Sequence, residues 1–137
     1  MLVHNDCPNG QTPKTRNGKL AGGKHPVTNV PFDKNGYPVF DSKFNAKLMK
    51  DKFLKSDSVQ FSEANAQLKA ALQSGEISES LFTSSQIKQI NSEKTPSGYI
   101  WHHHQDEGVL QLVDKKIHSK TGHTGGRNIW GGGSSHR

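Results

Sequence analysis

Histidines are concentrated near the C-terminal end of the chain, where five of the eight lie between residues 102 and 123. They are His102, His103, His104, His118 and His123. Imidazole is the commonest metal ligand among protein side chains, and a neutral imidazole can also act as a general base. Several imidazoles can therefore bind one ion while a further imidazole takes a proton from water. The cluster predicts a one-metal site.

The segments around the first three histidines predict a β-hairpin. Residues 99–101 are strand formers, and they follow a turn sequence at 95–98. A polar connection at 105–108 ends in glycine and leads to a second apolar run at 109–113. Because successive strand side chains point to opposite faces, the first two histidines should have different roles.

A short helix should follow the hairpin and carry His118. Asp114 can cap a helix that begins at Lys115, and Gly122 stands where a helix usually ends. Residues five apart do not share a helical face, so His118 and His123 can converge only if Gly122 ends the helix. With that condition met, the helix and the strand end could share one metal ion.

His104 and Asp106 are candidates for supporting roles. His104 would share the strand face of His102, so we interpret it as a neighbour of the ligands or as a substitute ligand. Asp106 could orient an imidazole or could simply be a turn residue, and the sequence favours neither.

The histidine pattern resembles a known group of nucleases. The matching residues are 101–106, 111–113, His118 and 123–126, and the upstream residues 22–33 and 36–40 resemble the segment that commonly precedes such domains. Together they resemble the WHH branch of the HNH and endonuclease VII superfamily, whose members are mostly C-terminal toxin domains of bacterial polymorphic toxins. The resemblance spans residues 20–133 and implies an α+β fold, with a ββα-metal finger packed on several N-terminal helices.

The resemblance also implies a role for each histidine. His102 would be a metal ligand, His103 the general base, and His118 and His123 the remaining ligands. The cofactor would be one divalent ion, either zinc, nickel, magnesium or manganese. In relatives such as the nuclease colicins the last two ligands lie four residues apart, so the spacing of five at His123 departs from that pattern.

The composition favours a polyanionic partner. The net charge is +6 and the pI is near 9.5, while residues 61–113 carry three basic against six acidic side chains, so the basic charge lies in the two flanks. Such a surface attracts nucleic acid, and we expect double-stranded DNA. A soluble basic domain without this role would have similar composition. The candidate phosphate contacts are Lys115, Lys116, Lys120 and Arg127.

Together these features predict a metal-dependent endonuclease toxin and favour a DNase. By resemblance it would be delivered into the cytoplasm of a competing bacterium and neutralised by an acidic immunity protein. One alternative is an RNase toxin of the same fold, since nothing in the sequence reports contact with a 2′-hydroxyl. The other is a nucleic-acid-binding module with a structural zinc, although structural zinc usually recruits thiolates and the one cysteine, Cys7, is remote in sequence. No apolar run approaches the length of a membrane span.

The rest of the chain predicts one domain with a small core, because only 30% of the residues are hydrophobic and the mean hydropathy is -0.81. We expect an extended basic leader at 1–31, a nuclease domain at 32–133 and a tail at 134–137. Within the domain, a helical scaffold at 41–92 would support the metal core at 98–126.

Local patterns divide the scaffold further. Residues 33–36 have the form of a hairpin turn, with aromatic residues on both sides that should be buried. Helices are expected from Asp41 to Lys55, from Ser62 to Gly75, around 76–82 and after a capping box at 83–86. His25 is expected to be structural or solvated and not a metal ligand, and Trp130 is expected to be buried.

Overall fold

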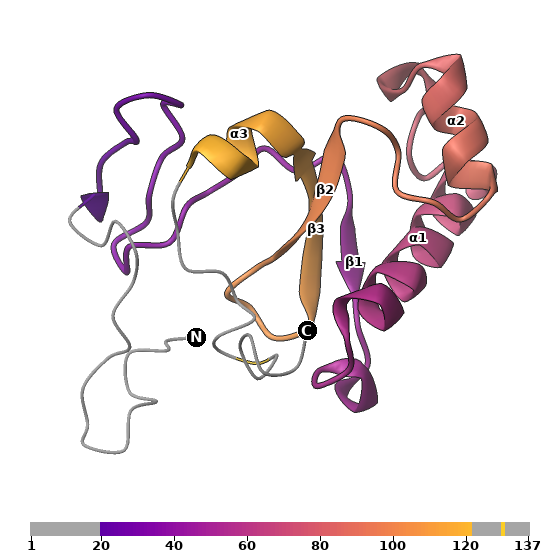
Figure 1. The fold of residues 1–137 in the computed structure, drawn as a ribbon, viewed down its shortest axis with the longest axis horizontal. Helices are drawn as coiled ribbons and strands as arrows, with labels where there is room; N and C mark the ends of the chain where they lie inside the picture. Colours follow the sequence, from indigo (N-terminus) through magenta and orange to yellow (C-terminus); the bar gives the residue numbers. More distant parts are fainter. Residues whose placement is uncertain (1–19, 122–129, 131–137) are drawn as a thin grey trace.

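The computed structural model describes residues 20–121 and Trp130. A three-stranded antiparallel sheet lies at the centre, with helices on both faces (Figure 1). The strands are β1 (Asn45–Lys47), β2 (Tyr99–His103) and β3 (Val109–Asp114), and the α-helices are α1 (Asp57–Ser74), α2 (Ser84–Asn91) and α3 (Lys115–Lys120). The α+β class expected from the sequence is confirmed.

The predicted hairpin and the helix that follows it are present. The sheet order is β1-β3-β2, so β3 is the central strand, and Trp101 pairs with Leu112 in the hairpin. Gly108 has a φ of 74° in the connecting turn, a conformation that favours glycine. Asp114 caps α3 by accepting a hydrogen bond from the Ile117 backbone nitrogen, as expected.

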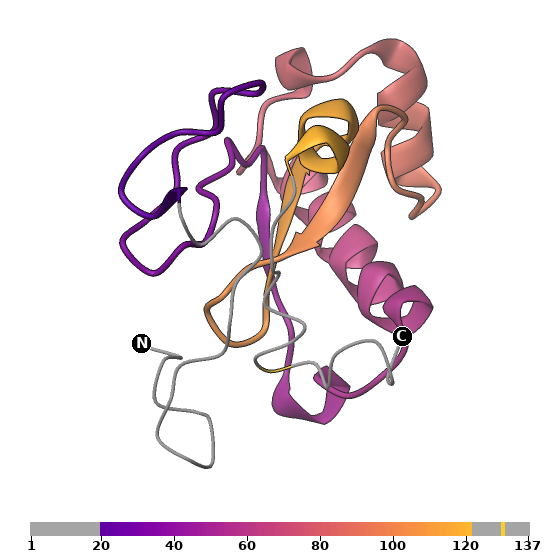
Figure 2. The same cartoon turned by 60° about the vertical axis from the view of Figure 1, so that its left-hand side comes forward.

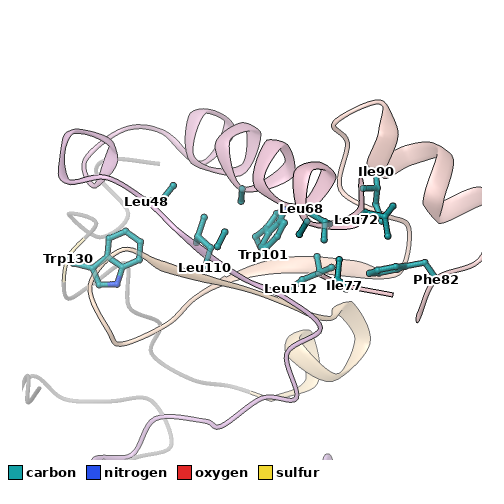
Figure 3. Packing of buried hydrophobic residues seen from close by; sticks show 13 residues of the cluster. Leu48, Leu68, Leu72, Ile77, Phe82, Ile90, Trp101, Leu110, Leu112 and Trp130 are labelled. Atoms are coloured by element: carbon teal, nitrogen blue, oxygen red, sulfur yellow. The ribbon is translucent and has the colours of Figure 1, made fainter. Parts of the chain in front are cut away.

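The main core lies between the sheet and the long helix α1 (Figure 3). Ser56 caps the start of α1, and Gly75 ends it with a φ of 84°. The apolar residues of α1 recur at helical spacing and pack on the sheet face that carries Trp101, Leu110 and Leu112. The residues that complete this cluster are Ala46, Leu48, Ala64, Leu68, Ala71, Leu72, Ile77, Phe82, Ile90 and Trp130.

The helix predicted from Asp41 to Lys55 is wrong. Residues 45–47 form β1 instead, and the backbone nitrogens of Lys43 and Leu48 donate to carbonyls of β3 and of the hairpin turn. The free edge of β3 offers a row of backbone donors and acceptors, and pairing with it outweighs local helical preference. Leu48 is buried, Met49 is 74% exposed, and Lys50–Lys52 form a short 3₁₀ helix.

The other helix boundaries were predicted in part. α1 begins at Asp57 and not at Ser62, because the Ser56 hydroxyl supplies an earlier cap. The helix expected around 76–82 is only a 3₁₀ helix, Glu79–Leu81. The capping box before α2 is confirmed, with Thr83 and Gln86 exchanging both hydrogen bonds.

Residues 20–40 pack on the sheet face opposite α1, on the same side as α3 (Figure 2). The turn at 33–36 forms as predicted, with Gly36 at a φ of 84° and Phe32 bridged to Pro38. Phe32, Tyr37 and Phe40 are buried, as expected. Residues 20–31 belong to the expected leader, yet they bond to the turn segment through Gly22 and Phe32. Residues 1–19 and the tail at 134–137 lie outside the described residues.

Candidate active site

His102 and His118 come together between the sheet and α3. His102 Nδ1 and His118 Nε2 lie 3.2 Å apart, although one residue comes from β2 and the other from α3. His102 is buried, and His118 is partly exposed. The ring of Phe40 packs against both imidazoles, with centroid distances of 4.8 Å and 5.3 Å. Phe40, which belongs to the N-terminal segment, therefore restricts the motion of both imidazole rings.

The separation of these two nitrogens fits a shared metal ion. Two imidazole nitrogens bound tetrahedrally to one zinc ion at the usual bond length lie about 3.3–3.4 Å apart. The observed 3.2 Å is close to that value, and at this distance the two rings also form a hydrogen bond with each other. The described residues contain no group of three or more histidine, cysteine, aspartate or glutamate side chains with metal-binding geometry. They therefore supply two nitrogen donors, while the third expected ligand, His123, lies outside the described residues.

An oxygen donor lies on the same sheet face. Gln111 of β3 is directly opposite His102 in the register, and paired residues of an antiparallel sheet share a face. The Gln111 Oε1 atom is buried and has no hydrogen-bond partner among the residues that the structure describes. A buried polar atom of this kind is rare, and a bound cation would satisfy it. The donor set of two imidazoles and a nearby amide oxygen suits a divalent cation.

His103 points to the other face of the sheet, as the alternation of strand side chains predicts. Its Nε2 atom is 2.7 Å from Gln60 Oε1 and 3.6 Å from Asp57 Oδ1, both on α1. The imidazole packs between the rings of Phe61 and Trp130, and it is 7% exposed. His102 and His103 thus have different environments, which is the basis for assigning them different roles.

His104 follows the end of β2 and contacts the hairpin turn. Its Nδ1 atom accepts a hydrogen bond of 3.0 Å from the Asp106 backbone nitrogen, and the Asp106 carboxylate is 3.6 Å away. Its carbonyl accepts a hydrogen bond of 2.7 Å from the indole nitrogen of Trp130. Trp130 is buried, as predicted, and it connects the turn to His103.

The expected phosphate contacts lie on α3. Lys115, Lys116 and Lys120 are exposed, and none has a salt bridge with another described residue. Arg127 lies outside the described residues. His25 is structural, as expected, because its Nδ1 atom accepts from two backbone nitrogens of its own turn. The described lysines thus place positive charge on the helix that carries His118.

Sequence reasoning missed the contribution of α1. The sequence predicts only a supporting scaffold for these helices, yet Asp57 and Gln60 contact His103 directly. One signal was available, since Gln60 precedes Ala64 and Leu68 at intervals of four and so occupies the apolar face of the helix. A polar side chain at such a position needs a buried partner.

None of the described helices is long and apolar enough to cross a membrane. No curated protein matches the chain. The sequence profile of the family described as the DNase/tRNase domain of colicin-like bacteriocin matches residues 30–125, which include the hairpin, α3 and the histidine cluster. The match covers well over half of the chain. The chain therefore belongs to the family of DNase/tRNase domains of colicin-like bacteriocins and is a nuclease toxin domain.

Proposed function

We propose that this domain is a metal-dependent endonuclease of the HNH type, in the WHH branch, and that it hydrolyses phosphodiester bonds in double-stranded DNA. The observation that carries the proposal is the 3.2 Å approach of His102 Nδ1 to His118 Nε2. Strand and helix contribute one nitrogen each to a position that a single cation can occupy. The nearby Gln111 oxygen, which is buried and unpaired within the described part of the chain, supports the same position.

In this proposal the ligands are His102, His118 and His123. A divalent cation bound there supplies positive charge to the phosphate and to the departing oxygen. The packing of Phe40 against two of these rings keeps both in place before the cation binds. Less reorganisation is then needed on binding, which favours affinity. Zinc, nickel, magnesium and manganese are the candidate ions.

His103 is the proposed general base, which takes a proton from the attacking water. It is the last residue of β2, and the hairpin turn follows it. A reacting group at the end of a strand can be approached from both faces of the sheet, so the opposite orientations of His102 and His103 are compatible with one reaction centre. His104 and Asp106 would support the turn beside that centre.

Positively charged side chains would bind the phosphates of the nucleic acid. Lys115, Lys116 and Lys120 are exposed on α3 beside His118, and with Arg127 they are the proposed phosphate contacts. Such contacts carry no sequence information, so cleavage with little sequence preference is expected. The family description names both DNase and tRNase activity, which makes an RNase the second candidate.

The biological role follows from the toxin family. We propose delivery into the cytoplasm of a competing bacterium and neutralisation by a cognate acidic immunity protein. An acidic inhibitor would complement the basic charge of the chain, whose net value is +6. We further propose that residues 32–133 are the nuclease domain, preceded by a basic leader.

The test is a plasmid cleavage assay with Mg²⁺, Mn²⁺, Ni²⁺ or Zn²⁺, with matched RNA and tRNA substrates alongside. Nicking of the plasmid that EDTA stops is the expected result. His103→Ala should abolish cleavage and retain metal binding by calorimetry, whereas His118→Ala should weaken metal binding. His25→Ala is the control, because the His25 imidazole accepts hydrogen bonds from backbone nitrogens of its own turn and has no role in the proposed site. Cleavage that persists in EDTA, or a fully active His103→Ala variant, would contradict the proposal.

A further inference from the structure

We propose that Gln60 is a positioning residue that selects the tautomer of His103, so that Nε2 carries the hydrogen and Nδ1 is the basic nitrogen. The catalytic importance of this choice depends on the function proposed above, but the choice itself does not. Gln60 lies in the second turn of α1, and its side chain reaches His103 Nε2 with a distance of 2.7 Å.

The orientation of the Gln60 amide is fixed by two other contacts. Its Nε2 atom donates to the backbone carbonyls of Lys52, at 2.9 Å, and of Phe53, at 2.8 Å. Carbonyl oxygens only accept hydrogen bonds, so the NH₂ group must face them. A flipped amide would place its oxygen against two carbonyl oxygens. The Oε1 atom is therefore the one that faces His103.

The orientation of Gln60 determines which nitrogen of His103 carries a hydrogen. Gln60 Oε1 is an acceptor, so the imidazole nitrogen at 2.7 Å must donate to it. In the other neutral tautomer two lone pairs would face each other at this distance. Gln60 is fully buried and His103 is nearly so, and burial makes such a repulsion costly.

Asp57 favours the same tautomer. Its Oδ1 atom is 3.6 Å from His103 Nε2, beyond a hydrogen bond but close enough for electrostatic attraction to an N–H group. Asp57 and Gln60 belong to the first two turns of α1, and the Ser56 cap fixes where those turns begin. The start of this helix thus presents two oxygens to one nitrogen of the proposed base.

The choice of tautomer decides which part of the ring can accept a proton. Nδ1 is bonded to the ring carbon that joins the side chain to Cβ, so it lies nearer the backbone than Nε2 does. Because Gln60 engages the outer nitrogen, the basic nitrogen of the ring lies close to the end of β2, where His102 also lies. A general base needs a nitrogen without a hydrogen directed at its water.

The test is long-range ¹H–¹⁵N correlation NMR of histidine-labelled, metal-free protein, which distinguishes the two neutral tautomers for each ring. His103 in the unmodified chain should show the Nε2–H pattern with a preference of at least about tenfold, the ratio that one buried hydrogen bond supplies. The Nδ1–H pattern in the unmodified chain would overturn the inference without any variant.

Two matched substitutions on α1 complete the test. Gln60→Met keeps the length of the side chain but removes the acceptor, so the His103 tautomers should approach a mixture. Cleavage should then fall about twofold in kcat, because about half of the rings would carry the hydrogen on Nδ1, with an unchanged KM for DNA and unchanged metal binding. Gln67→Met is the control, since Gln67 lies on the same helix but bonds to Lys47 and Glu63.

The outcomes separate this inference from the proposed function. An unchanged tautomer in a folded Gln60→Met variant would refute the role of Gln60 even if the protein cleaves DNA. A chain that cleaves no nucleic acid but loses the tautomer preference in Gln60→Met would refute the proposed function alone. If Gln60→Met does not fold, the tautomer of the unmodified chain still decides the question.

Discussion

The hydrogen bond between Trp101 and Asn65 gives a prediction about how the site is held on its scaffold. The indole nitrogen of Trp101 donates to Asn65 Oδ1 at 2.8 Å, and both side chains are buried. Trp101 immediately precedes His102 and His103 in β2, while Asn65 lies on α1. The bond therefore fixes the strand that carries two site histidines against the long helix.

Asn65→Leu should destabilise the fold by about 1–3 kcal/mol. The substitution keeps the side-chain volume but leaves the Trp101 N–H group buried without an acceptor, and that range is the usual cost of such a group. In a domain of this size, each kcal/mol lowers the melting temperature by about 4–8 °C. A decrease of several degrees in thermal unfolding, followed by circular dichroism, is the expected result.

A double-mutant cycle with Trp101→Phe isolates the bond from the cavity that a smaller ring leaves. In the double variant both hydrogen-bonding groups of this pair are gone. Its loss in the free energy of unfolding should therefore be smaller than the sum of the two single losses by about 1–2 kcal/mol. Chemical unfolding of all four proteins gives the four free energies. Costs that add to within about 0.5 kcal/mol would refute the reasoning, because they would show that the two side chains are not coupled.

Further predictions concern the ring beside the metal position and the hairpin turn. Phe40→Ala should lower the free energy of unfolding by about 3–5 kcal/mol and should also lower the metal affinity measured by calorimetry. Val39→Ala is the control, because Val39 is 53% exposed, and it should change neither quantity. Gly108→Ala should lower the free energy of unfolding by at least about 1 kcal/mol more than Gly75→Ala. Both glycines have positive φ, but a Cβ at Gly108 would lie 2.8 Å from the Phe53 ring, while Gly75 has nothing within 4 Å. Equal costs in urea unfolding would contradict this account of the turn.

The sequence by itself predicted the elements whose signals are local. A turn, two apolar runs and the capping residue Asp114 were enough to predict the hairpin and α3. The opposite orientations of His102 and His103 follow from strand geometry alone. The cap of α2 was equally clear, because Thr83 and Gln86 satisfy each other within one turn.

Tertiary structure decided what depends on contacts between distant segments. Residues 45–47 have no strong strand signal, and they form β1 only because the edge of β3 needs backbone partners. The approach of His102 to His118 depends on how α3 packs against the sheet and on Phe40, a residue far away in sequence. The partner of His103 was unpredictable for the same reason, since Gln60 reaches it only after α1 has packed on the sheet. Local sequence determines the type of an element and which side chains lie on each of its faces. Burying a polar group without a hydrogen-bond partner costs free energy, so buried polar side chains from distant segments are paired in the folded structure.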